Sequence, residues 1–266
     1  MTEYSSLFIS HGAPTLLVED SPARDYLSGL GKQLGKPKAI LVISAHHHSH
    51  GDSVAITSNA TPETIYDFSG FPDELYQTSF AAPGDPKLAV QIVDHLTQAG
   101  FAAATDVNRG FDHGAWVPLH LMYPESDVPV LQISINMRKS PQWHYDLGRA
   151  LAPLRREGIL IIGSGGATHN LQEFFKGGYQ LDAESPAWVT TFADWLSDRI
   201  EAGDVSAVLD AVQSGPEGQR NHPTMDHILP LFVAMGAGGE QAKGNRLHKS
   251  STHGVLAMDA YAFSEN

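Results

Sequence analysis

The chain has 266 residues, and its 17 basic and 30 acidic side chains give a formal charge of −13. This acidic balance argues against nucleic acid or an anionic membrane as a partner, because both require a basic surface. The absence of cysteine excludes disulfides and thiolate metal sites, so any bound metal must have nitrogen and oxygen ligands.

The N-terminal segment MTEYSSLFISHG lacks the basic region and the long apolar run of a signal peptide. No segment approaches the roughly 20 consecutive apolar residues of a membrane-spanning helix. We therefore expect a cytoplasmic protein.

Strand-like and helix-like segments alternate along the chain. Several strand-like runs are continuously apolar, which is typical of strands covered on both faces. Ser21 and Asp85 are suitable N-caps, and each stands before a proline at the first helical position. The predicted strands are residues 7–10, 39–44, 54–58, 101–107, 128–135 and 159–162, and the predicted helices are residues 22–31, 86–100, 143–157, 186–202 and 204–213.

This alternation predicts an α/β fold with a mixed, largely parallel sheet flanked by helices. No repeat or flexible linker divides the chain, so we expect one domain over residues 1–266. Residues 61–84 are aromatic and rich in turn formers without clear periodicity. Long segments of this kind often shape substrate pockets.

Five histidines stand out, and four of them follow predicted strands. In an open α/β sheet, ligands bind at the carboxyl ends of the strands. Imidazole is a common metal ligand and an acid or base near neutral pH. The pattern therefore predicts a metal-dependent enzyme, although a lone histidine at such a position is more often a hydrogen-bonded structural residue. The five are His11, His46, His113, His169 and His227.

His46 begins a run of three histidines. Side chains alternate faces in an extended chain, so His46 and His48 are expected on one face and His47 on the other. A solvated loop is also compatible with this run. The sequence leaves open whether His47 or His48 takes the place of His46 as a metal ligand.

His227 competes with His222 for the same role. Pro223 disfavours helical backbone at His222, which places that residue in a loop. We expect His227 in the first turns of a helix that carries Ile228 and Leu231, and this more rigid position favours it.

His113 and His169 lie in glycine-bounded segments. Asp112 precedes His113, and a neighbouring carboxylate can orient an imidazole. The run GSGGATHN around His169 predicts a tight turn after a strand, and it has neither the lysine nor the spacing of a phosphate-binding loop. Its glycines would also let a substrate approach the backbone closely.

Five ordered motifs, SHGAP, SAHH, GFDHGAW, HNL and HPTMDHILPL, together resemble the class III (LigB-type) extradiol ring-cleaving dioxygenases. The segment TIYDFSGFPDELYQTSFAAPG and the motif WHYDLGRAL are similar to the 4,5-DOPA extradiol dioxygenase branch of that family. The resemblance extends over residues 7–258. It implies a single α/β domain with a mixed, helix-flanked central sheet and an active site at the C-terminal ends of its strands.

The resemblance also implies roles for the histidines. His11, His46 and His227 are similar to the metal ligands, His169 to the catalytic base, and His113 to the histidine that contacts oxygen or substrate. The implied native metal is Fe(II), with Zn(II) able to occupy the same ligands. The implied reaction opens a catechol such as DOPA with O₂ to a muconic semialdehyde, and a homo-oligomer is compatible with the sequence. Imidazoles at His47 and His48 depart from the branch, which often has an aromatic residue after the ligand.

Two other functions use the same histidines. A zinc hydrolase would activate a metal-bound water and would need no O₂. A metal-binding protein without catalytic activity would bind the ion and leave catechols unchanged.

Overall fold

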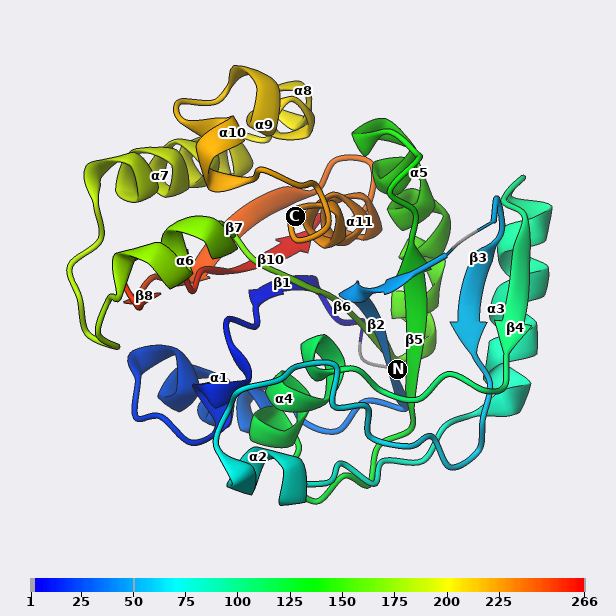
Figure 1. Ribbon diagram of the computed structural model, residues 1–266. Helices are drawn as coiled ribbons and strands as arrows, with labels where there is room; N and C mark the ends of the chain where they lie inside the picture. Colours follow the sequence, from blue (N-terminus) through cyan, green and yellow to red (C-terminus); the bar gives the residue numbers. More distant parts are fainter. Residues whose placement is uncertain (1–2, 50, 266) are drawn as a thin grey trace.

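An eight-stranded sheet runs through the computed structural model, which describes residues 3–49 and 51–265 (Figure 1). Its strand order is β4-β3-β5-β2-β6-β1-β10-β7. The pairs β3–β4, β5–β2, β2–β6 and β6–β1 are parallel, whereas β3–β5, β1–β10 and β10–β7 are antiparallel. The predicted mixed, largely parallel α/β sheet is therefore confirmed. Its strands are β1 (Ser6–Ser10), β2 (Ala39–His48), β3 (Val54–Thr57), β4 (Ala103–Asp106), β5 (Val130–Ile135), β6 (Ile159–Gly165), β7 (Lys243–His248) and β10 (Ala260–Ser264).

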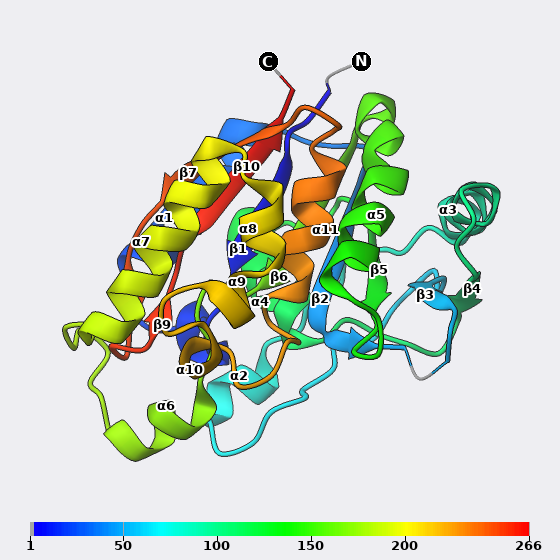
Figure 2. The same ribbon diagram turned by 90° about the horizontal axis from the view of Figure 1, so that it is seen from above.

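Helices cover both faces of the sheet (Figure 2). One face carries α5 (Pro141–Leu151), α7 (Ala187–Ala202) and α11 (Leu229–Ala237), and the other carries α1 (Pro22–Leu34) and α4 (His113–Met122). The helix α3 (Pro86–Gln98) packs on β3 and β4 at one end of the sheet. Shorter elements are α2 (Asp73–Gln77), α6 (Leu171–Gly177), α8 (Val205–Leu209), α9 (Ala211–Ser214), α10 (Gly218–Asn221), the 3₁₀ helices η1 (Pro14–Leu17) and η2 (Ala152–Glu157), and the small antiparallel pair β8 (Ser251–Thr252) and β9 (Leu256–Ala257).

The predicted helix starts at Ser21 and Asp85 are confirmed. The Ser21 hydroxyl accepts a hydrogen bond from the backbone N–H of Arg24, and the Asp85 carboxylate accepts one from that of Leu88. The helix predicted for residues 143–157 instead ends as an α-helix at Leu151 and continues as η2. Pro153 accounts for the change, because it lacks the N–H that the next α-helical hydrogen bond requires.

The central strands carry the core. Residues 40–43 of β2 and 159–162 of β6 are almost fully buried, as expected for strands covered by helices on both faces. None of the helices in the described part of the chain has both the length and the apolar composition needed to cross a membrane.

Candidate metal centre

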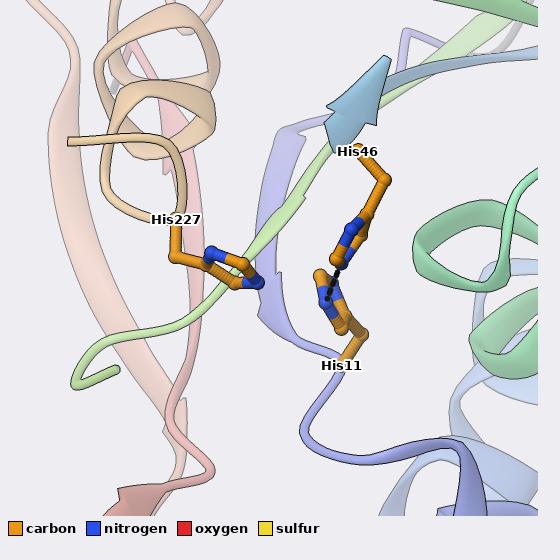
Figure 3. Close-up of side chains that lie close together, drawn as sticks. All are labelled: His11, His46 and His227. Carbon is orange, nitrogen blue, oxygen red and sulfur yellow. Dashed lines mark hydrogen bonds between the residues drawn. The ribbon is translucent and has the colours of Figure 1, made fainter. Parts of the chain in front are cut away.

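Three histidines from distant parts of the chain point toward one another (Figure 3). The Nε2 atoms of His11 and His46 are 3.1 Å apart. The ring centre of His227 lies 5.3 Å from that of His11 and 4.9 Å from that of His46. One ring nitrogen of each residue lies within 4.8 Å of the other two, which is the spacing that a shared metal ion requires.

The neighbouring strands β1, β6 and β2 explain how His11 and His46 meet. Ser10 of β1 pairs with Gly165 of β6, and Ser164 pairs with Ser44 of β2, so the strands end at the same edge of the sheet. His11 follows β1 directly. His46 lies near the end of β2, because this strand continues to His48 rather than ending at residue 44 as predicted.

A glycine in β6 lets His227 join this edge. A Cβ atom on Gly165 would lie 2.1 Å from the carbonyl oxygen of His227, so a side chain there would push the two segments apart. The backbone N–H of Gly166 donates a hydrogen bond of 2.9 Å to the same oxygen. The glycines of GSGG thus bring the backbone before α11 close to the sheet.

The prediction that His227 lies inside a helix is wrong. The helix α11 begins at Leu229, and His227 occupies the turn before it. Pro230 explains this start, because proline is favoured in the first turn, where its missing N–H costs no hydrogen bond. His113 also differs from expectation, since it is the first residue of α4 rather than part of a loop directly after a strand.

The outer ring nitrogen of each of the three histidines faces a polar partner. The Nδ1 atom of His11 is 3.0 Å from the Ser164 hydroxyl, which itself donates to the Gly114 carbonyl. Ser164 therefore accepts from His11, and the proton of this ring resides on Nδ1. The Nδ1 atom of His227 lies 2.5 Å from a carboxylate oxygen of Asp226.

The Nδ1 atom of His46 faces a carboxylate oxygen of Asp67 at 3.6 Å. With all three protons on the outer nitrogens, the Nε2 lone pairs of His11, His46 and His227 are free for a ligand. Such outer partners are typical of metal-binding histidines, because they orient the ring and hold its tautomer.

Burial keeps these rings neutral. It lowers the pKa of His11 and of His227 well below the ordinary value, and the neighbouring imidazoles lower both further. Burial and the nearby His113 lower the pKa of His46 to about 3. Two unprotonated nitrogens at 3.1 Å repel each other, and a cation between them removes that repulsion. The residues present therefore fit a divalent metal with nitrogen ligands.

His113 lies beside this cluster, with its ring centre 4.0 Å from that of His46. Its backbone N–H and its Nδ1 atom contact one oxygen of Asp67 at 3.0 and 2.9 Å. Burial by itself would raise the pKa of Asp67, but the hydrogen bond and charge of His113 outweigh it and lower this pKa to about 2. Asp67 is thus a carboxylate that orients two histidines at once.

His169 follows β6 and stacks on His227, with ring centres 3.3 Å apart and planes inclined by 6°. Its backbone N–H donates to the Asn221 carbonyl, which holds the loop in place. Burial lowers the pKa of His169 to about 4, and the Asp226 carboxylate opposes that shift. The ring is therefore neutral at physiological pH and able to accept a proton.

The three alternative histidines lie outside this arrangement. His47 is buried, whereas His48 contacts the Ala45 carbonyl at 2.6 Å. His222 is buried with its Nε2 atom 2.9 Å from the Ala167 carbonyl, to which it donates. Within residues 3–49 and 51–265, none of them belongs to a group with the spacing of metal ligands.

Asp67 and Asp226 are site residues that the sequence analysis missed. Asp226 directly precedes a candidate ligand in DHILPL, and this was a usable signal. Asp67 is far from every candidate histidine in the sequence. Its only indication was its place in the aromatic segment 61–84, which folds over the histidines.

A cavity of about 430 Å³ opens above the histidines. His46, His113, His169 and His227 line it together with Asp67 and Asp226. Aromatic walls come from Phe68 and Phe71 of segment 61–84 and from Phe174 and Phe175 of α6. The cavity is large enough for a substituted single-ring molecule.

Residues 5–263 match the LigB family, described as the catalytic LigB subunit of aromatic ring-opening dioxygenase. A 4,5-DOPA dioxygenase extradiol from Beta vulgaris is 43% identical over 264 residues, which cover 97% of this chain and 96% of that protein. The 4,5-DOPA dioxygenase extradiol of Escherichia coli strain K12 is 38% identical over 243 residues, covering 89% and 86%. The crystal structure of an uncharacterized Escherichia coli K12 protein matches with a TM-score of 0.76 and 31% identity, covering 97% of this chain and 99% of that one.

Proposed function

We propose, from the premise that this chain belongs to the LigB family and is an extradiol ring-cleaving dioxygenase, that it opens a catechol such as DOPA at an Fe(II) centre. The observation that carries this proposal is the convergence of three neutral imidazoles, two of which, His46 and His227, line the cavity. We assign the metal-ligand role to His11, His46 and His227. The substrates are the catechol and O₂, and the product is a muconic semialdehyde. We further propose that residues 1–266 act as one catalytic domain in the cytoplasm.

Fe(II) is the proposed native metal, and Zn(II) fits the same three nitrogens because it generally binds such ligands more tightly than ferrous iron does. When bound, Fe(II) supplies the redox chemistry that lets O₂ react with a catechol. The protein residues bind and orient the substrate and move its protons.

His169 is the proposed general base. Its neutral ring at the cavity wall can take a proton from a catechol hydroxyl. The imidazolium that forms is stabilised by the carboxylate of Asp226, whose negative charge already opposes the lowering of the His169 pKa. Base and compensating charge thus lie on the same side of the cavity.

His113 is the proposed residue that contacts oxygen or substrate. Its Nδ1 atom donates to Asp67, which directs the other ring nitrogen away from that carboxylate. Because His113 lines the cavity, this second nitrogen is the atom that would contact the substrate or O₂.

The direct test is anaerobic reconstitution with Fe(II), followed by DOPA and simpler catechols with O₂ uptake and product absorbance recorded together. We expect one O₂ consumed for each catechol opened. The alternative function, a zinc hydrolase, is tested by assaying Zn(II)-loaded protein with esters and amides. Absence of O₂ uptake with every catechol, or hydrolysis without O₂, would refute the proposal.

Replacing His169 tests whether this residue acts as a general base or as a metal ligand. We expect His169→Ala to keep its iron and to lose about 10²- to 10⁴-fold in turnover, the usual contribution of a general base. Metal content by mass spectrometry and single-turnover kinetics check this. A variant that loses its metal would instead make His169 a ligand.

A further inference from the structure

The charges that line the cavity are of one sign. Two carboxylates, Asp67 and Asp226, belong to its wall, and among the described residues that line it none is lysine or arginine. If three neutral imidazoles hold a divalent ion, these two carboxylates offset its charge. A negative group brought in by the substrate would then have no compensating partner, and burying such a group unpaired is costly.

The outer walls of the cavity are aromatic. Phe68 contacts Phe71 edge-on with ring centres 5.5 Å apart, and Phe174 contacts Phe175 in the same way at 5.3 Å. Phe175 is 72% exposed, so its ring is accessible to a ligand that enters from the solvent. The face of an aromatic ring carries partial negative charge and attracts ammonium groups.

The net charge of the whole chain acts in the same direction. At −13, the protein concentrates cationic small molecules near its surface and repels anionic ones. The carboxylates, the aromatic walls and the overall charge therefore favour the same kind of ligand.

We propose that the preferred substrates are catechols whose side chain is a cation without a carboxylate, such as a catechol ethylamine. This inference rests on the proposed function and specifies its substrate class. The catechol ring lies toward the histidines, and the ammonium group lies among the phenylalanines near the mouth. A zwitterionic side chain such as that of DOPA ranks below the cation, and an anionic side chain ranks last.

Four catechols with matched rings test the preference: dopamine (cationic), DOPA (zwitterionic), 4-ethylcatechol (neutral) and 3,4-dihydroxyphenylacetate (anionic). We expect kcat/KM to fall in the order dopamine, DOPA, dihydroxyphenylacetate, with roughly tenfold between the first and the last, and with 4-ethylcatechol below dopamine. Calorimetric Kd values for the Zn(II)-loaded protein without O₂ should follow the same order. Equal values, or a preference for the anion, would overturn the proposal.

Leu171 allows the charge at the cavity mouth to be reversed. It lines the cavity from α6 and is 50% exposed, so a lysine fits there without disturbing the core. We expect Leu171→Lys to shift the ratio of anionic to cationic kcat/KM about tenfold toward the anion. Gln172→Lys adds the same charge at the next position, which is exposed and does not line the cavity, and we expect it to shift the ratio less than about twofold.

Equal shifts in Leu171→Lys and Gln172→Lys would overturn the placement of the cation at the mouth. Consumption of all four catechols at equal kcat/KM would overturn the charge preference and leave the dioxygenase intact. If no catechol consumed O₂, the proposed function would fail, and the Kd order of the Zn(II)-loaded protein would still decide the charge preference.

Discussion

The two ends of the central sheet hold two different polar clusters, one of neutral side chains and one of ion pairs. At the carboxyl ends of the parallel strands, the candidate metal centre consists of neutral imidazoles. At the other end, where the N- and C-terminal segments emerge together (Figure 2), an arginine–glutamate cluster surrounds a cavity of about 260 Å³. That cluster comprises Arg149, Arg155, Arg156, Glu3, Glu240 and Glu265.

The charges of the arginine–glutamate cluster are paired within the cluster. Each of its three guanidinium groups has a carboxylate partner, and the buried Arg155 also donates to the carbonyls of Tyr4 and Gly238 at 3.0 and 2.7 Å. The inner nitrogen atoms of the histidine cluster are not paired with groups of opposite charge, because they face one another. The difference indicates that one end stabilises the fold and the other binds a ligand. Substitutions should therefore have separable effects at the two ends.

The largest expected effect is that of removing a proposed ligand. His227→Ala should lose its stoichiometric metal and lower kcat/KM by more than about 100-fold, which exceeds the usual loss for an outer partner of a ligand. Metal analysis after dialysis and O₂ uptake measure the two effects. His48→Ala is the control and should keep its metal, because His48 lies outside the cluster. Full metal content in His227→Ala would contradict the assignment.

The next largest effect is a loss of stability, and it is expected in the arginine–glutamate cluster. Arg155→Met should lower the free energy of unfolding by about 2–5 kcal/mol, because it leaves buried carbonyls without donors and removes a buried charge from its partner. Urea denaturation measures this loss, and kcat/KM of the folded variant should stay unchanged. The exposed Arg156 provides the control: Arg156→Met should cost less than about 1 kcal/mol. A large loss of kcat/KM in folded Arg155→Met would show that the two ends are coupled.

A smaller effect is expected for the carboxylate that orients two histidines. Asp67→Asn retains an oxygen that can accept from His113 but removes the charge that faces His46. Metal affinity and turnover should each fall by about 10- to 100-fold. Competition with a chelator measures the metal affinity, and O₂ uptake measures the turnover. Asp73→Asn, at an exposed position of the same segment, should change neither. An unchanged affinity in Asp67→Asn would mean that the contact only shapes the loop.

The part of the site that sequence could predict is the part built on the central strands. The runs before His11 and His46 are continuously apolar, and a buried strand is the simplest structure that accounts for such a run. Parallel neighbours then bring their carboxyl ends to one edge. Capping residues predicted the helix starts in the same local way, as the Ser21 hydroxyl shows.

The elements that escaped prediction lack a local pattern. The helix α4 is buried on nearly all sides, so it has no polar face to reveal a helical period. The strand β7 has the polar sequence KGNRLH, and only its pairing with β10 makes it a strand. The contact of Asp67 with His46 and His113 joins segments far apart in the chain. Tertiary packing alone creates that contact.

The smallest expected effect is a change in the acid dependence of stability, and it concerns His144, a buried histidine that belongs to neither cluster. The Nδ1 atom of His144 donates to the Ser140 carbonyl, and its Nε2 atom accepts from the backbone N–H of Asn136. Burial lowers the pKa of this ring to about 4, although the Ser140 hydrogen bond opposes the shift. A second proton on His144 would therefore displace the Asn136 donor.

In the unfolded chain, the His144 ring takes up its proton near pH 6.5. Between that pH and about 4 the unfolded state binds more protons than the folded state, so the free energy of unfolding must fall as the pH falls. This ring contributes at most about 1.4 kcal/mol per pH unit to the slope. Urea denaturation of metal-free protein across this range should show the fall, and His144→Gln should reduce its slope by up to one proton. A slope that is the same in His144→Gln would mean that His144 takes up its proton equally in both states, and that acid sensitivity comes from the histidine cluster and the other buried imidazoles.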